Sequence, residues 1–272
     1  MYLLFDIGGT NIRIAVSGNG QKIDEFKNIT TPPSFEEGIS KVKKLIMELS
    51  RGEKIEAAAG GIAGALDKDK SMLIASPHIA NWVNKPLKLK LEEAIGASVK
   101  LENDSLLGGL GEAVYGAGKG INIVAYIALG TGVGGARFVD GEIDENSLEF
   151  EPGHQIIDLD GNQCNCGGKG HLETYVGGFY LEKKYHKRAE EITDHKVWDE
   201  AAKYLAIGLN NTIVHWSPDI VILGGSVANK IPLDATQRYL SQFLTIFPTK
   251  PTLVKAQLDY PGLYGALELI KS

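Results

Sequence analysis

The sequence predicts an α/β protein built from a duplicated domain, and three observations lead to this prediction. An apolar strand over residues 2–7 ends at a glycine turn and is followed by a second strand over 12–16, in which apolar residues alternate with smaller or polar ones. The same order recurs later, where an apolar strand over 121–129 meets a glycine-rich turn and a short strand over 136–139. In both halves helices and strands then alternate, which is typical of α/β domains. Two such domains facing each other would form a cleft.

The other elements of the first half follow from their periodicity and their end signals. Ser34 and Glu37 have the spacing of a capping box, and the apolar residues after them recur at helical intervals. Gly52 suits the end of that helix. The remaining elements that we expect are a strand at 22–29, a strand at 55–60, a helix between Pro86 and Gly96, a strand at 99–101 and a helix that begins at 103–105.

The second half carries its longest helical pattern over 196–216. A strand over 219–223 ends at two glycines, and 251–258 is a further strand candidate. With 272 residues the chain has room for two domains. The predicted domains are 1–117 together with a C-terminal helix over 263–272 that packs back onto it, and 118–262.

Composition and charge exclude several classes of protein. The formal net charge of −6 argues against a nucleic-acid partner. The longest apolar run, Ile123–Leu129, is far too short to cross a bilayer, and Asp6 interrupts the apolar start, which argues against a signal peptide. Cys164 and Cys166 are too close for an unstrained disulfide. We therefore expect a cytoplasmic protein in which this pair binds a metal.

Three glycine turns could bind phosphate groups: Asp6–Thr10, Gly130–Gly135 and Gly224–Gly225. Phosphoryl transfer needs backbone N–H groups and little steric bulk around the phosphates, and such turns supply both. The middle turn matches the dinucleotide pattern G-x-G-x-x-G, but a strand and a turn follow it at 136–141, where that motif requires a helix. The sequence contains no G-x-x-x-x-G-K-[ST] motif, which excludes a P-loop.

A purely structural role in tight hairpins is the alternative for each glycine turn taken alone. The repetition of the turn at the same point of both halves favours phosphate binding. Asp6, at the end of its strand, could hold Mg²⁺ through water, or it could cap the turn. Neither role excludes the other.

These motifs resemble the two phosphate motifs and the adenosine motif of the sugar kinase/actin/Hsp70 superfamily. Within it, Glu151-Pro152-Gly153-His154 and the C-x-C-G-x-x-G pattern that begins at Cys164 resemble the ROK family (repressors, open reading frames, kinases). The resemblance runs almost end to end, from Asp6 to Ala266. It implies duplicated actin-like (ribonuclease H-like) α/β domains around a central cleft, and a kinase that acts on a sugar.

The resemblance also implies ATP and Mg²⁺ as cofactors and assigns residues to both substrates. The nucleotide would be bound by Asp6, Gly8, Gly9, Thr10, Asn11, Gly130, Thr131, Gly132, Gly134, Gly224 and Gly225. The sugar would be bound by Gly64, His78, Asn103, Asp104, Glu151, His154 and Glu173. His78 stands where an asparagine is usual in the family, so sugar specificity stays open.

Asp104 has two interpretations. It follows a short strand and opens a helix, a position at which Asp commonly caps the helix. A sugar hydroxyl must, however, lose its proton as it attacks, so a kinase needs a carboxylate within reach. The resemblance implies this role, because the family's catalytic base is the Asp of an Asn-Asp pair at this place.

The metal site departs from the usual ROK pattern. The family commonly binds zinc through one His and three Cys, and here His171 stands where the third Cys is usual. Imidazole is a good zinc ligand, so His154, Cys164, Cys166 and His171 are expected to form a structural Cys₂His₂ site. The competing interpretation is that the metal has been lost and His171 is an ordinary loop residue.

We therefore expect an ATP-dependent hexose kinase, homodimeric as is usual in the family, with Asp104 as general base. Glucose, fructose, mannose and N-acetylated hexosamines share nearly all of the expected contacts, so the sugar stays open. One alternative is a catalytically silent sugar-binding or regulatory ROK protein. The family's repressors carry an N-terminal helix-turn-helix, whereas the printed chain starts directly on its first strand, which favours the enzyme.

Overall fold

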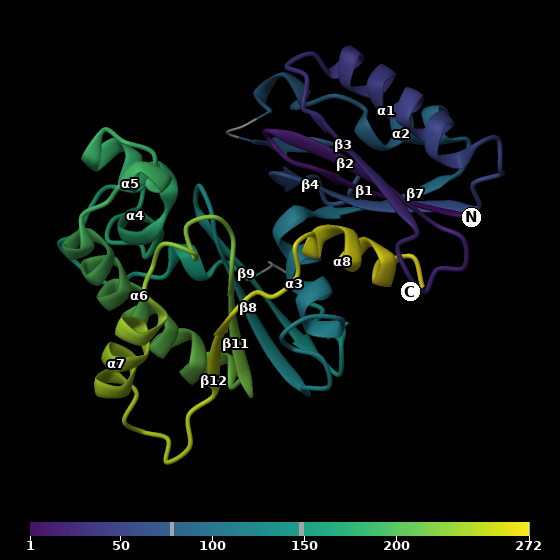
Figure 1. Ribbon diagram of the computed structural model, residues 1–272. Helices are drawn as coiled ribbons and strands as arrows, with labels where there is room; N and C mark the ends of the chain where they lie inside the picture. Colours follow the sequence, from purple (N-terminus) through teal and green to yellow (C-terminus); the bar gives the residue numbers. More distant parts are fainter. Residues whose placement is uncertain (77–78, 147–149, 272) are drawn as a thin grey trace. The chain divides into compact units, whose positions relative to one another are not determined.

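A computed structural model describes residues 1–76, 79–146 and 150–271. The chain forms two compact units (Figure 1), one comprising 1–111 with 259–272 and the other comprising 112–258. No helix of the described residues is both long and apolar enough to span a bilayer. The chain passes from the first unit to the second between Gly111 and Glu112, inside a helix.

The first unit is built on a five-stranded sheet. Its strand order is β3-β2-β1-β4-β7, in which the first three strands are antiparallel and the last two run parallel to β1. The strands are β1 (Tyr2–Ile7), β2 (Asn11–Ser17), β3 (Glu25–Thr30), β4 (Ala57–Ile62) and β7 (Ser98–Asn103). A separate hairpin is formed by β5 (Ala65–Leu66) and β6 (Leu73–Ala75).

Helices cover both faces of this sheet. One face packs against α1 (Phe35–Ser50) and α2 (Leu87–Ile95), and the other against α8 (Pro261–Leu269), as Figure 1 shows. Ser34 caps α1 by accepting from Glu37 N over 3.3 Å, as the capping spacing predicts. The short 3₁₀ helix η1 (Ala80–Trp82) places Trp82 in the core beneath α1. The helix α3 (Asp104–Val114) follows β7 directly.

The second unit repeats the same sheet. Its strand order is β10-β9-β8-β11-β12, again with three antiparallel strands followed by two parallel ones. The strands are β8 (Ile123–Leu129), β9 (Val133–Val139), β10 (Glu142–Ile143), β11 (Ile220–Gly224) and β12 (Thr252–Lys255). The helices are η2 (Pro152–His154), α4 (Glu173–Val176), α5 (Gly178–Tyr185), η3 (Ala189–Glu191), α6 (His195–Trp216) and α7 (Leu233–Phe243).

The two sheets confirm the predicted duplicated α/β fold. The second glycine turn is shorter than the sequence indicated, because β9 already begins at Val133 and includes Gly134 and Gly135. A Cβ on Gly135 would lie 2.7 Å from Pro152 Cγ, so this strand position has no room for a side chain. Glycine is there because of packing against η2, not because the chain turns.

Candidate functional site

The carboxyl edge of the first sheet brings together acidic residues from β1, β7 and the start of α3. Asp6 pairs in register with Gly61 of the parallel strand β4, and Gly61 pairs with Glu102 of β7. Asn103 is the last residue of β7, and Asp104 is the first residue of α3. The parallel pairing of three strands therefore brings Asp6 and the Asn103-Asp104 pair to one edge.

Asn103, not Asp104, caps α3. The Asn103 side-chain oxygen accepts hydrogen bonds from Ser105 N at 2.9 Å and from Leu106 N at 3.1 Å. Asp104 Oδ1 accepts from the adjacent Ser105 N, also at 2.9 Å. Because the Asn103 side chain accepts the first N–H groups of the helix, the Asp104 carboxylate is not needed as the cap.

The environment of Asp104 disfavours its charged form. Burial and, to a smaller extent, the negative charge of Asp6 raise the pKa of Asp104 to about 6, against the opposing effect of the Ser105 backbone N–H. A carboxyl group with such a pKa is charged at neutral pH and accepts a proton more readily than an exposed aspartate. This arrangement suits a general base.

The Asn103 amide also fixes the loop that begins at Gly64. Its Nδ2 donates to Gly64 O over 2.9 Å. Gly64 has φ = 135°, and a Cβ there would lie 2.3 Å from Ala75 O, so only glycine fits. One Nδ2 hydrogen of Asn103 then remains for a ligand. The predicted sugar-binding residue His78 lies outside the described residues.

Asp6 forms an ion pair that sequence reasoning missed. Arg13 Nη1 donates to Asp6 Oδ2 over 2.8 Å, and the Arg13 guanidinium lies 5.4 Å from the ring centre of Tyr260. Burial raises the pKa of Asp6, and the charge of Arg13 opposes this. The pair could have been found in the sequence, because a tight β1–β2 hairpin places Arg13 directly opposite Asp6.

The first glycine turn is held by backbone bonds. Gly8 N donates to Asn11 O over 2.8 Å, and Thr31 N donates to Thr10 O over 2.9 Å. Thr31 Oγ1 also donates to Gly8 O over 2.7 Å. Gly9 and Thr10 remain at the surface between these bonds. The turn is thus rigid, and its tip is open to a ligand.

The second glycine turn, 130–132, is fixed to the start of α5. Gly178 N donates to Gly130 O over 2.8 Å, and Phe179 N donates to Thr131 O over 2.9 Å. At the other glycine pair, Gly224 lies beside Ala128 in the parallel pairing of β11 with β8. Both predicted nucleotide motifs of the second unit therefore lie at the carboxyl ends of neighbouring strands. Gly134, also assigned to the nucleotide, lies inside β9 instead.

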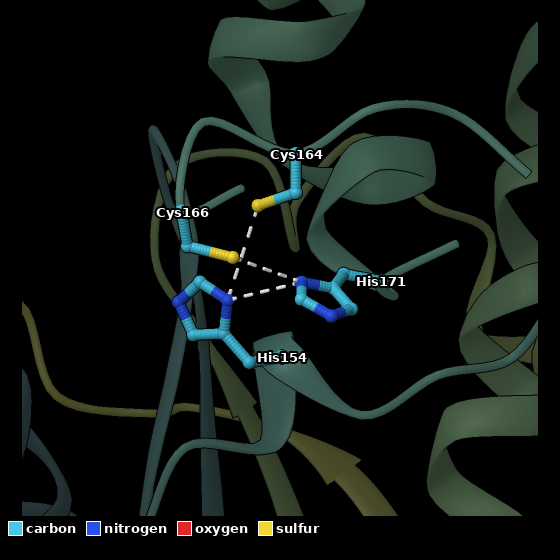
Figure 2. A group of neighbouring side chains, drawn as sticks. All are labelled: His154, Cys164, Cys166 and His171. Carbon is cyan, nitrogen blue, oxygen red and sulfur yellow. Dashed lines mark hydrogen bonds between the residues drawn. The ribbon is translucent and has the colours of Figure 1, made fainter. Parts of the chain in front are cut away.

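The four predicted metal ligands form one cluster (Figure 2). The candidate ligand atoms of His154, Cys164, Cys166 and His171 all lie within 4.8 Å of one another. The two Nδ1 atoms are 3.3 Å apart, Cys166 Sγ lies 3.3 Å from His171 Nδ1, and Cys164 Sγ lies 3.9 Å from His154 Nδ1. Two thiols and two imidazoles at this spacing fit a tetrahedral zinc ion.

The backbone around the cluster leaves room for the His171 ring. A Cβ on Gly168 would lie 2.6 Å from His171 Nε2, so a larger residue would displace the imidazole. Cys164 and His171 are buried, whereas Cys166 is exposed. Tyr180 Oη donates to Cys164 Sγ over 3.5 Å and adds support that the sequence did not reveal.

Glu173 connects the metal cluster with the second glycine turn. Cys164 Sγ donates to Glu173 Oε1 over 3.1 Å. The other oxygen, Oε2, faces Gly132, where a Cβ would lie 2.9 Å from it. Glu151, in contrast, is exposed and lines a groove between η2 and α6 together with Gln155 and Trp216.

The sequence of this chain is similar to those of known sugar kinases over almost its whole length. A glucokinase of Thermotoga maritima is 28% identical, with 98% of this chain and 96% of the relative covered. An N-acetyl-D-glucosamine kinase of Escherichia coli O127:H6 is 29% identical, with 98% of each chain covered.

A solved structure extends the similarity to three dimensions. A ROK family glucokinase from Streptomyces griseus, in complex with glucose and AMPPNP, is 28% identical and superposes with a TM-score of 0.79 over 98% of each chain. The ROK family itself matches residues 2–272. With the duplicated sheets, the glycine turns and the His/Cys cluster, this match over nearly the whole length establishes that the chain belongs to the ROK family.

Proposed function

We propose that this ROK protein is a sugar kinase that transfers the terminal phosphoryl group of ATP to a hexose hydroxyl, with Asp104 as the general base. The proposal rests on the half-buried Asp104 carboxylate with its raised pKa, which is free of helix capping because Asn103 caps α3. In this mechanism Asp104 accepts the proton of the attacking hydroxyl, and Asn103 donates its remaining N–H to a sugar oxygen. ATP turnover measured with and without sugars distinguishes this kinase from a silent sugar binder.

The choice of a hexose rests on the relatives. The similar proteins named above are glucokinases and an N-acetyl-D-glucosamine kinase, and the Streptomyces protein holds glucose. The sugar residues that we propose are Gly64, His78, Asn103, Asp104, Glu151, His154 and Glu173. Which hexose is preferred is decided by contacts to single hydroxyls.

The nucleotide assignment rests on the glycine turns and on the AMPPNP of the Streptomyces structure. Backbone N–H groups of 9–10 and 131–132 would bind the phosphates, since the N–H groups of Gly8 and Gly130 already donate within their own turns. Asp6 would hold Mg²⁺ through water, while Arg13 keeps one of its oxygens in place. The metal would reduce the charge repulsion between the phosphates and the attacking oxygen.

We also propose a structural zinc ion bound by His154, Cys164, Cys166 and His171. The cluster supports it, because each residue offers one ligand atom and the atoms lie within 4.8 Å of one another. A metal-bound thiolate has no proton to donate, so zinc would release Glu173 from its bond with Cys164. Glu173 could then accept a hydrogen bond from a sugar hydroxyl. We further propose that the protein is cytoplasmic and forms a homodimer.

The pH dependence of activity tests the role of Asp104. The base must be deprotonated, and its folded-state pKa is raised to about 6. The kcat/KM for the sugar should therefore be highest above neutrality and fall about tenfold per pH unit below that pKa. The measurement is the pH profile of kcat/KM over about pH 4.5 to 8.5. In Asp104→Glu the acid limb of this profile should be lost or should shift to another pH. A flat wild-type profile would exclude a base with this pKa.

A bulky side chain at Gly130 tests the phosphate turn. A Cβ there would meet no described protein atom within 4 Å, whereas one on Gly132 would also press on Glu173. Gly130→Val should thus leave the fold and the dissociation constant of the sugar unchanged, and raise the KM for ATP by about tenfold or more through collision with the phosphates. Unchanged kinetics for both substrates would remove Gly130 from the nucleotide site.

A further inference from the structure

The β5–β6 hairpin is fastened to the end of β7 at two points. At its base, Asn103 Nδ2 donates to Gly64 O. At its tip, Lys70 Nζ forms a hydrogen-bonded ion pair with Glu102 Oε2. Because Glu102 and Asn103 are consecutive, both fastenings act on the two residues that precede Asp104.

Glu102 is buried and depends on this partner. Its side chain is 5% exposed, and its second oxygen, Oε1, accepts from Asn103 N over 3.0 Å. A buried carboxylate is costly unless it is paired. Within the described ranges, Lys70 is the cation that lies within ion-pair distance of Glu102. The Lys70 ammonium therefore fixes the side chain that holds the Asn103 backbone.

The backbone of Lys70 adopts a conformation that glycine would adopt more easily. Its φ is 49°, in the left-handed region. The turn around it is otherwise well bonded, since Asp67 Oδ1 accepts from Ser71 N at 2.6 Å and from Met72 N at 2.8 Å. A single residue keeps this conformation where the surrounding structure holds it, and here lysine also supplies the ammonium that pairs with Glu102, which glycine could not do.

The hairpin does not depend on Lys70 for its fold. Asn84 N donates to Leu73 O over 2.8 Å, and Lys88 N donates to Ser71 O over 3.0 Å. Leu73 is fully buried. Loss of the Lys70–Glu102 pair should therefore loosen the hairpin without unfolding it.

We propose that Lys70, acting through Glu102, is a positioning residue that holds Gly64 and Asn103 in place for the sugar. The inference rests on the proposed function, because it takes the edge formed by Gly64, Asn103 and Asp104 as the acceptor site. In this proposal Lys70 acts on the sugar site through Glu102 and Asn103 and not by its own contact with the sugar. Loss of Lys70 should therefore change the KM for the sugar and not the KM for ATP.

The test compares four variants of the full chain. Lys70→Met should raise the KM for the sugar by about tenfold and leave the KM for ATP unchanged, and Lys70→Gly should do the same although it relieves the backbone strain. Lys70→Arg should restore the KM for the sugar, because it keeps the cation. Lys68→Met, at an exposed lysine of the same turn, is the matched control and should behave as wild type.

Hydrogen exchange provides a readout that does not need activity. The amides of 64–75 should exchange faster in Lys70→Met than in Lys68→Met, because the hairpin has lost its second fastening. The proposal is overturned if wild type is an active kinase and neither Lys70→Met nor Lys70→Gly changes its KM for the sugar, or if exchange over 64–75 is unchanged. A wild-type protein that phosphorylates no sugar would instead refute the proposed function, while the exchange experiment would still test the fastening.

Discussion

Replacing Asp104 by asparagine should reduce kcat by about 10²–10⁴-fold while the sugar still binds. Asparagine keeps the shape of the side chain and can still accept from Ser105 N, but it cannot take the proton of the attacking hydroxyl. The measurement is steady-state kinetics of ADP release, with sugar affinity determined separately by calorimetry. Activity within a few-fold of wild type would show that another group is the base.

The same variant should be more stable than wild type. The folded-state pKa of Asp104 lies above that of the unfolded chain, so its charge destabilises the fold above pH ~6. This cost should shrink as the pH falls below about 6, where the folded protein takes up the proton, and vanish only below the ordinary aspartate pKa of 3.8, where the unfolded chain is protonated as well. At neutral pH Asp104→Asn should thus gain roughly 2–3 kcal/mol in its free energy of unfolding. Asp69→Asn, at an exposed carboxylate, should change neither activity nor stability, and serves as the control.

Loss of the zinc site should have the second large effect. Protein purified without chelator should contain about one zinc per chain, and His171→Ala should lower that content. The variant should bind the sugar more weakly than wild type and ATP about equally, because the protonated Cys164 thiol then holds Glu173. Metal analysis and calorimetry with each substrate measure these changes.

Two further variants separate metal binding from a general effect of losing a histidine. His171→Cys supplies the ligand that is usual in the family and should retain zinc. His195→Ala, at an exposed position at the start of α6, should keep both the metal and the sugar affinity. Metal-free wild-type protein with full kinase activity would exclude the zinc hypothesis and leave the kinase assignment intact.

Much of the fold could be predicted because its signals are local. The apolar strands β1, β8 and β11 each end at glycine, and α1 has a capping residue and helical spacing within its own sequence. The helix α4 was missed because four residues carry too little periodicity to be recognised. The end of the second glycine turn was placed too late because packing of Gly135 against Pro152 is a tertiary contact.

The same distinction holds for the site. The metal ligands lie within eighteen residues of sequence, from His154 to His171, and their pattern is readable there. Arg13 could have been found from the β1–β2 register. The Lys70–Glu102 pair could not, because it joins residues 32 positions apart and exists only once the hairpin has folded against β7.

The most direct test of the central claim is detection of the product. Purified protein incubated with ATP, Mg²⁺ and a panel of hexoses should form a sugar phosphate, seen by ³¹P NMR or mass spectrometry, in equal amount to the ADP released. At least one hexose or N-acetylated hexosamine should be phosphorylated, and Asp104→Asn should form the same product far more slowly. ATP hydrolysis without sugar phosphate, or no turnover with any sugar of the panel, would contradict the assignment of this chain as a sugar kinase.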